Sequence, residues 1–116
     1  MVDDDQAILR ALEYLLESAD YTVRSFRSAG ALLDSRSLPQ IHCLISDIDM
    51  PDIDGIELLR VVNAARPGLP VILITGYPER LQGVPNLGKS SPRCFTKPFQ
   101  SQELLAAVRD ALRRRT

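Results

Sequence analysis

The sequence contains few of the residues that build disulfide-rich or metal-binding domains. It has no tryptophan, one histidine and two cysteines among its 116 residues. Cys43 and Cys94 lie in separate apolar runs, and the only histidine near either of them is His42. Because neighbouring residues of a strand point to opposite faces, His42 and Cys43 cannot share a metal ion there. We therefore expect two reduced core thiols, as in a cytoplasmic protein.

The sequence also lacks a strong net charge and a long hydrophobic run. Its formal net charge of −1 argues against direct nucleic-acid binding. No apolar stretch is long enough to cross a bilayer, and no signal peptide precedes the acidic start. With 45% hydrophobic and 25% charged residues, the chain has the composition of a soluble globular protein. We expect residues 1–116 to form a single cytoplasmic domain, with no output domain and no membrane contact.

Short apolar runs that alternate with helical patterns predict an α/β fold. Four runs are strand candidates, at residues 22–26, 41–45, 71–74 and 94–96. Two of them, 41–45 and 71–74, are continuous and rich in branched residues, as expected of strands covered on both faces. Apolar residues at helical spacing predict helices over residues 8–16, 29–33, 56–62 and 104–112. This order is typical of a parallel sheet with right-handed crossovers and helices on both faces.

The segment from Glu79 to Pro92 breaks this pattern. It should contain a helix, but it includes Gly83, Pro85 and Gly88. In a helix interior, proline costs about 3 kcal/mol and glycine about 1 kcal/mol relative to alanine. We therefore predict a short or irregular helix here.

Polar residues follow the predicted strands. Asp3 and Asp4 come after Val2, while Asp47, Thr75 and Lys97 each follow a later strand. In doubly wound sheets the carboxyl ends of the strands form the ligand site. Crowded carboxylates favour a hard divalent cation such as Mg²⁺. A hydroxyl and a lysine beside a carboxylate can hold the oxygens of a transferred phosphoryl group.

Four stretches also resemble a known family. They are VDDD at residues 2–5, SDIDMPDIDG at 46–55, ITGY at 74–77 and TKPF at 96–99. In their order and spacing they resemble the response-regulator receiver domain of two-component signalling, and they look closest to the receivers of LuxR/FixJ-type regulators. The resemblance implies a flavodoxin-like, doubly wound sheet of five parallel strands in the order 2-1-3-4-5. The first strand would be short, because only Met1 and Val2 precede the acidic pair.

The resemblance also implies a function. A sensor histidine kinase or a phosphotransfer protein would donate a phosphoryl group to Asp47, with Mg²⁺ or Mn²⁺ as cofactor. The domain would then change its conformation or association, for example by forming a homodimer. Such a protein is a signalling phosphoacceptor, and its only catalysis would be the phosphorylation and dephosphorylation of its own Asp47.

Each site residue receives a role from the family. The phosphoacceptor is Asp47; the metal ligands are Asp3, Asp4, Asp47 and the backbone carbonyl of Asp49; the phosphate-stabilising residues are Thr75 and Lys97. The Thr75 hydroxyl would move toward the phosphoryl group, and Lys97 would pair first with Asp47 and then with the phosphate. Pro98 would follow a cis peptide bond, a form found in about 5–6% of X-Pro bonds in folded proteins.

Two departures from the family leave an alternative open. Cys94 stands at the switch position, where the family usually has an aromatic ring, and Phe95 would face the other side of the strand. The irregular segment after Glu79 corresponds to the family's signalling surface. The alternative is a receiver-like protein-interaction module that no longer switches.

A less favoured alternative is a small phosphatase of the haloacid-dehalogenase type. Those enzymes also place two aspartates after a strand, as Asp47 and Asp49 do here. They require a threonine or similar residue where this chain has Pro51, and acidic metal ligands late in the chain that are missing after Lys97.

Overall fold

The computed structural model describes residues 1–85 and 91–113. In these residues it contains a parallel sheet of three strands, in the order β1 (Leu44–Asp47), β2 (Val71–Thr75) and β3 (Arg93–Thr96). The α-helices are α1 (Gln6–Ser18), α2 (Ala29–Asp34), α3 (Gly55–Ala65) and α4 (Ser101–Arg113). Two 3₁₀ helices, η1 (Leu38–Gln40) and η2 (Pro78–Gly83), complete the described elements.

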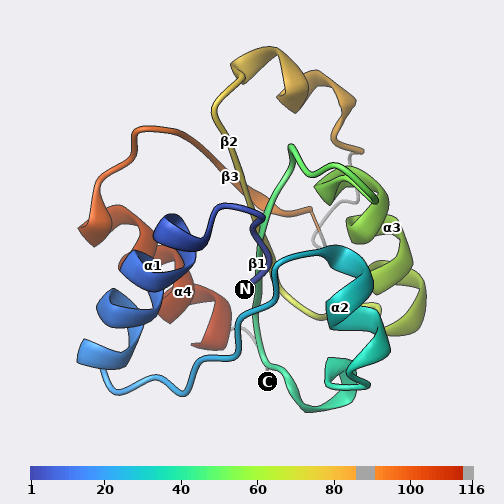
Figure 1. Ribbon diagram of the computed structural model, residues 1–116. Coiled ribbons are helices and arrows are strands. Elements are labelled where there is room, and N and C mark those ends of the chain that lie inside the picture. Colours follow the sequence, from blue (N-terminus) through green and yellow to red (C-terminus); the bar gives the residue numbers. More distant parts are fainter. Residues whose placement is uncertain (86–90, 114–116) are drawn as a thin grey trace.

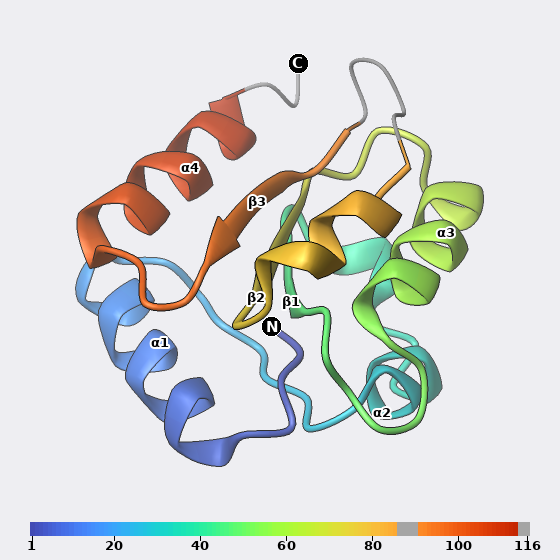
Figure 2. The ribbon, with the colours of Figure 1, turned by 90° about the horizontal axis from the view of Figure 1, so that it is seen from above.

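The helices cover both faces of the sheet (Figure 1). Alternate strand residues point to opposite faces, so Ile45, Ile72 and Ile74 pack with α1 and α4. Leu44 and Leu73 pack in a second apolar cluster with α2 and α3. Figure 2 shows the same division from above, with the sheet between the two helix pairs. β1 and β2 are thus buried on both sides, as their continuous apolar runs predict, whereas β3 is exposed at Arg93 and Cys94.

Polar residues fix where the helices begin. The side chain of Asp5 accepts hydrogen bonds from the backbone N–H groups of Ala7 and Ile8, and so caps α1. Asp54 caps α3 in the same way, through the N–H of Glu57 at 2.9 Å. Such caps stabilise a helix by about 1 kcal/mol each, because they satisfy N–H groups that have no partner within the helix.

The predicted strand at 41–45 is wrong at its start, because β1 begins at Leu44. The carbonyl oxygens of Leu38 and Ile41 accept hydrogen bonds from the Arg66 side chain. These bonds hold the segment before β1 outside the sheet. Leu44 is the first residue to join it, with its N–H on Pro70 O at 3.0 Å.

The predicted five-stranded order appears only in reduced form among the described residues. Val2 makes isolated parallel bridges to Phe26 on one side and to Ser46 on the other. Of the predicted strand at 22–26, only Phe26 pairs in this way. The sheet proper therefore consists of β1, β2 and β3.

The prediction of an irregular fourth helix is confirmed where the structure describes it. Residues 78–83 form the 3₁₀ helix η2 rather than an α-helix. The remainder of the predicted segment includes residues 86–90, which lie outside the described residues. In the described part of the chain, no helix is long and apolar enough to cross a membrane.

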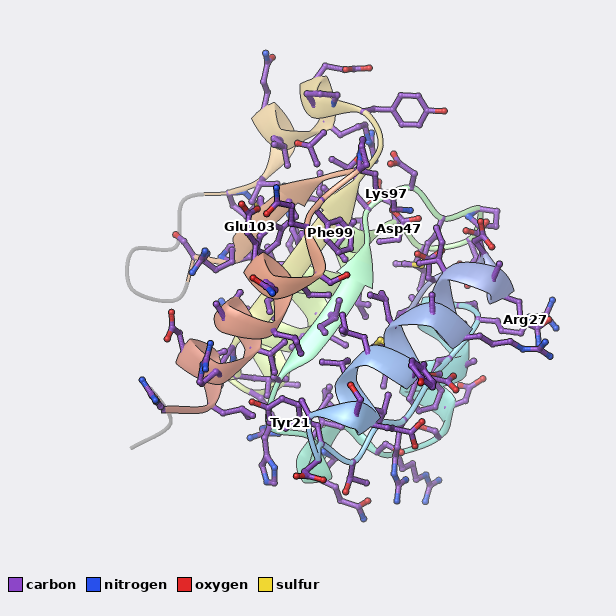
Figure 3. All side chains as sticks on the ribbon, turned by 90° about the vertical axis from the view of Figure 1, so that its left-hand side faces the viewer. Tyr21, Arg27, Asp47, Lys97, Phe99 and Glu103 are labelled. Atoms are coloured by element: carbon purple, nitrogen blue, oxygen red, sulfur yellow. The ribbon has the colours of Figure 1, made fainter. Side chains whose placement is uncertain are left out.

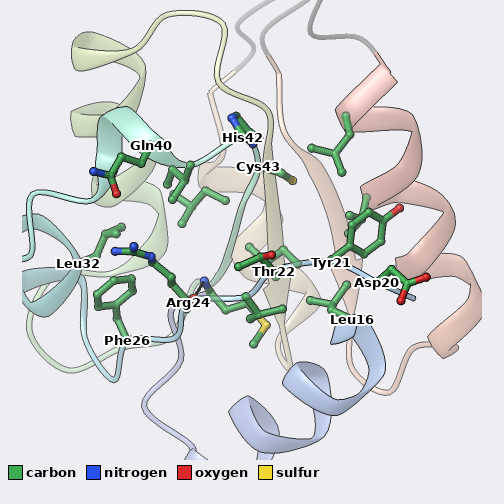
Figure 4. A pocket seen from close by; sticks show the side chains of 17 residues that line it. Leu16, Asp20, Tyr21, Thr22, Arg24, Phe26, Leu32, Gln40, His42 and Cys43 are labelled. Carbon is green, nitrogen blue, oxygen red and sulfur yellow. Dashed lines mark hydrogen bonds between the residues drawn. The ribbon is translucent and has the colours of Figure 1, made fainter. Parts of the chain in front are cut away.

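A cavity of about 440 Å³ lies at the amino-terminal ends of the strands, beside Met1 (Figure 4). Residues 20–24 line one wall and residues 40–45 another. The Met1 amino group donates a hydrogen bond to Arg24 O at 2.7 Å. Burial lowers the pKa of this amino group to about 6, although the Cys43 thiol and Glu13 act in the opposite direction.

This lowered pKa predicts that the 116-residue chain becomes more stable between pH 6 and pH 8. Below pH 6 the amino group is charged in both states, and the folded state bears the cost of burying the charge. Above pH 8 it is neutral in both states, so the free energy of unfolding should have risen by about 2–3 kcal/mol. Urea unfolding across this range should show the rise, and acetylation of the amino group should remove it. An identical pH dependence after acetylation would contradict the prediction.

Candidate functional site

The predicted site residues meet at the carboxyl edge of the sheet. Asp47 ends β1, Thr75 ends β2 and Lys97 directly follows β3. Asp3 follows Val2, whose bridges place it beside β1. Parallel strands that end at one edge bring their following residues together. Figure 3 shows Asp47 and Lys97 side by side at this edge.

Lys97 lies between two buried carboxylates. Its Nζ is 3.5 Å from Asp47 Oδ2 and 3.6 Å from Asp3 Oδ2. The Asp3 and Asp47 side chains are only 5% and 6% exposed, whereas that of Lys97 is 26% exposed. Both distances exceed the usual 2.7–2.9 Å or so of a charge-assisted hydrogen bond. Lys97 therefore donates a long hydrogen bond to Asp47, forms an ion pair with Asp3, and balances both charges.

The two buried carboxylates have raised pKa values. For Asp3, burial is the main cause; the nearby Asp47 raises its pKa further, while the Asp5 N–H and Lys97 lower it. For Asp47, burial is again the main cause, and the charge of Asp49 raises the pKa further. The backbone N–H of Asp49 and the charge of Lys97 lower it. The site is thus short of positive charge, even with Lys97 in place.

The same edge of the sheet fits a divalent metal ion. Carboxylate oxygens of Asp3, Asp4 and Asp47 lie within 4.8 Å of one another. Asp4 is exposed while the other two are buried, so the cluster opens to solvent on one side. A set of carboxylate oxygens with too little positive charge matches the preference of Mg²⁺ or Mn²⁺ for hard oxygen ligands.

The Thr75 hydroxyl points to Asp49 rather than to Asp47. Its Oγ1 donates a hydrogen bond to Asp49 Oδ2 at 2.6 Å and accepts one from the Tyr77 N–H at 3.0 Å. The Thr75 side chain is fully buried. The backbone N–H of Asp49 donates in turn to Asp47 Oδ1 at 3.2 Å. Asp49 thus contacts the phosphoacceptor candidate through its backbone and Thr75 through its side chain.

Sequence reasoning missed a cation at this site. Arg80, in η2, lies 3.2 Å from Asp49 Oδ1 through its Nε, and its Nη2 donates to Asp54 Oδ2 at 2.9 Å. Asp54 is half-buried, and its burial alone would raise its pKa. The Glu57 N–H and Arg80 outweigh that effect and lower the pKa. Nothing in the spacing of Asp49, Asp54 and Arg80 indicates that they meet, because η2 lacks a helical pattern.

Cys94 and Pro98 lie at the margin of the site. Cys94 is exposed, and its strand partner is Leu73, on the sheet face that packs against α2 and α3. Phe95 packs on the other face, as the alternation of a strand requires, with its ring centroid 6.0 Å from that of Phe99. The Lys97–Pro98 peptide bond is cis.

Comparisons with known proteins agree with this geometry. TodT, a response regulator protein of Pseudomonas putida, is 34% identical over 113 residues, which are 97% of this chain and 50% of TodT. The transcriptional regulatory protein FixJ of Bradyrhizobium diazoefficiens is 34% identical over 113 residues, which are 97% of this chain and 55% of FixJ. The chain therefore spans about half the length of these curated relatives.

The fold is shared with solved structures as well. The response regulator receiver domain protein of Clostridium thermocellum superposes with a TM-score of 0.87 at 26% identity, covering 97% of this chain and 91% of that one. The family profile of the response regulator receiver domain matches residues 1–109, which include every residue of the site. The resemblance seen in the sequence motifs is confirmed, and the chain belongs to the family of response regulator receiver domains.

Proposed function

We propose that Asp47 is a phosphoacceptor and that this domain receives a phosphoryl group from a sensor histidine kinase or a phosphotransfer protein. The observation that carries the proposal is the position of the Asp47 carboxylate. It is buried at the carboxyl end of β1, with Lys97 at 3.5 Å. The carboxylates of Asp3 and Asp4 lie close enough to share a metal ion with it. A carboxylate held in this way can attack phosphorus, as in other phosphoaspartyl intermediates.

In the transfer, a bond from an Asp47 carboxylate oxygen to phosphorus forms while the bond from phosphorus to the donor breaks. The donor bond is P–N in a phosphohistidine and P–O in a small acyl phosphate. The metal would be held by Asp3, Asp4, Asp47 and the backbone carbonyl of Asp49, and when bound it would neutralise charge on the phosphoryl oxygens. Lys97 is free to move from the carboxylate to a phosphoryl oxygen, because neither of its contacts is short.

Thr75 supplies the second contact to the phosphoryl group. Thr75 is the last residue of β2, beside the end of β1. Its hydroxyl has Asp49 Oδ2 as its nearer acceptor, at 2.6 Å, and Tyr77 O at 3.3 Å. A phosphoryl oxygen on Asp47 would be a stronger acceptor because it carries more negative charge. Rotation of the hydroxyl toward Asp47 would then alter the start of the segment that leads to η2.

The domain would hydrolyse its own acyl phosphate and catalyse nothing else, and it would act through a changed conformation or a homodimer rather than by binding nucleic acid. As a phosphoacceptor for a sensor kinase, the domain would lie in the cytoplasm. The match of residues 1–109 to the receiver family removes the support for a haloacid-dehalogenase-type phosphatase.

A receiver-like module that does not switch is the second candidate, and the exposed Cys94 favours it. Without an aromatic ring at this position, movement of Thr75 has no ring to draw inward. The two candidates differ after phosphorylation. A switching domain changes its association or the NMR signals of η2 once the adduct forms. An interaction module binds its partner equally well with and without the adduct.

The phosphoacceptor proposal predicts a covalent adduct. Incubation with acetyl phosphate and Mg²⁺ should add one phosphoryl group to the wild-type protein, measured by intact mass. Asp47→Asn should abolish the adduct, because an amide is not a nucleophile toward phosphorus under these conditions. Asp52→Asn is the matched control, since Asp52 is an exposed carboxylate of the same loop and should leave the adduct unchanged. Absence of an adduct on the wild type would refute the proposal.

A further inference from the structure

A chain of polar contacts connects Thr75 to η2. Thr75 Oγ1 donates to Asp49 Oδ2 at 2.6 Å, and the other oxygen of Asp49 lies 3.2 Å from Arg80 Nε. Arg80 also donates from Nη2 to Asp54 Oδ2 at 2.9 Å. One cation of η2 is therefore shared by two carboxylates of the loop that follows β1. The first of these carboxylates is the one that holds the Thr75 hydroxyl.

The geometry of Arg80 shows that its contact with Asp49 is an ion pair. Arg80 Nε is inaccessible to water, yet its N–H is not aimed closely enough at Asp49 to form a hydrogen bond. The short bond from Thr75 occupies Asp49 Oδ2, and Arg80 is held at Asp54. A small movement of Asp49 could therefore convert the ion pair into a hydrogen bond or break it.

We propose that Asp49 is the resting-state acceptor for the Thr75 hydroxyl and that Arg80 transmits the loss of this bond to η2. Thr75 has one hydroxyl proton, so it cannot donate to Asp49 and to a phosphoryl oxygen on Asp47 at the same time. Asp49 therefore competes with the phosphorylated site. Asp49 and Arg80 are positioning residues in this scheme, and the activated half of the scheme rests on the proposed function of Asp47.

The scheme differs from a simple charge effect of Asp49. Asp49 also raises the pKa of Asp47, so removing its charge would ease the binding of any anion at the site. That effect does not need Thr75. The competition does, and a double-mutant cycle between Asp49 and Thr75 separates the two explanations, because only residues that interact show a coupling energy.

The test measures the half-saturating concentration of beryllofluoride, a phosphoryl mimic, in the presence of Mg²⁺. Asp49→Ala should lower it by about threefold to tenfold, the equivalent of one lost hydrogen bond that competes with the site. In a Thr75→Val background the same substitution should lower it by a clearly smaller factor, because only the charge effect of Asp49 remains when there is no hydroxyl left to release. Asp52→Ala, at the exposed carboxylate of the same loop, should leave the value unchanged. An equal gain in both backgrounds would overturn the proposal.

A second arm needs no phosphoryl mimic. The Nε–H signal of Arg80 in a nitrogen–proton NMR spectrum of the unliganded protein should shift in both Thr75→Val and Asp49→Ala, and should not shift in Asp52→Ala. An unchanged Arg80 signal in Thr75→Val would overturn the link to η2. If neither the wild type nor any variant binds beryllofluoride, the proposed function of Asp47 fails. The Arg80 spectrum still decides whether Thr75, Asp49 and Arg80 are coupled.

Discussion

Replacing Gly55 with alanine should destabilise the protein by about 3 kcal/mol, the upper end of the usual cost of overpacking, because the site is rigid. A Cβ at this position would lie 2.4 Å from Asp47 O and 2.8 Å from Ile48 Cα. Both neighbours are backbone atoms, so neither can rotate away. The Gly55 N–H donates to Ile48 O at 2.9 Å, which holds the loop closed against the end of β1.

The same substitution should impair phosphorylation, because relief of the contact requires the backbone of Asp47 to move. Urea unfolding gives the stability, and the initial rate of adduct formation from acetyl phosphate gives the activity. Gly76→Ala is the matched control for stability, since a Cβ there meets no atom within 4 Å. A loss of less than about 1 kcal/mol in Gly55→Ala would show that the loop adjusts easily and that the clash is relieved at little cost.

Asp3→Asn should have opposite effects on stability with and without Mg²⁺. The folded-state pKa of Asp3 is raised above its ordinary value, so its contribution to stability is lost as the pH rises and the group ionises. At neutral pH the charge therefore destabilises the metal-free protein. The asparagine can still accept the Asp5 N–H bond, and we expect the free energy of unfolding to rise by about 1 kcal/mol without metal.

With Mg²⁺ the order should reverse. A wild-type protein that binds the ion gains about 2.7 kcal/mol at a concentration of 100 times the dissociation constant. Asp3→Asn removes one of three carboxylates from the cluster and should lose most of this gain. Thermal unfolding with and without Mg²⁺ measures both effects, and Asp110→Asn, at an exposed carboxylate of α4, is the control. An Mg²⁺ gain in Asp3→Asn equal to that of the wild type would contradict the metal assignment.

The sequence predicted the parts of the fold that follow from local patterns. Apolar spacing placed the four α-helices, because each buries one face against the sheet. The meeting of Asp3, Asp47 and Lys97 followed from parallel strands that end at one edge. The irregular segment after Glu79 was readable from its proline and glycine content.

Contacts between side chains of separate loops were beyond that reasoning. The bond from Thr75 to Asp49 and the ion pairs of Arg80 depend on how η2 lies against the loop after β1. No periodicity specifies that arrangement. The late start of β1 has a similar cause. Arg66, at the end of α3, donates a hydrogen bond to the carbonyl of Ile41 and keeps Ile41 out of the sheet.

The most direct test of the account locates the phosphoryl group in the chain. After treatment with acetyl phosphate and Mg²⁺, borohydride reduces an aspartyl phosphate to homoserine, and peptide mass analysis then identifies the residue. The account predicts homoserine at position 47, only when Mg²⁺ is present and only in protein that retains Asp47. Homoserine at another aspartate, or an unmodified chain at saturating acetyl phosphate and Mg²⁺, would contradict it.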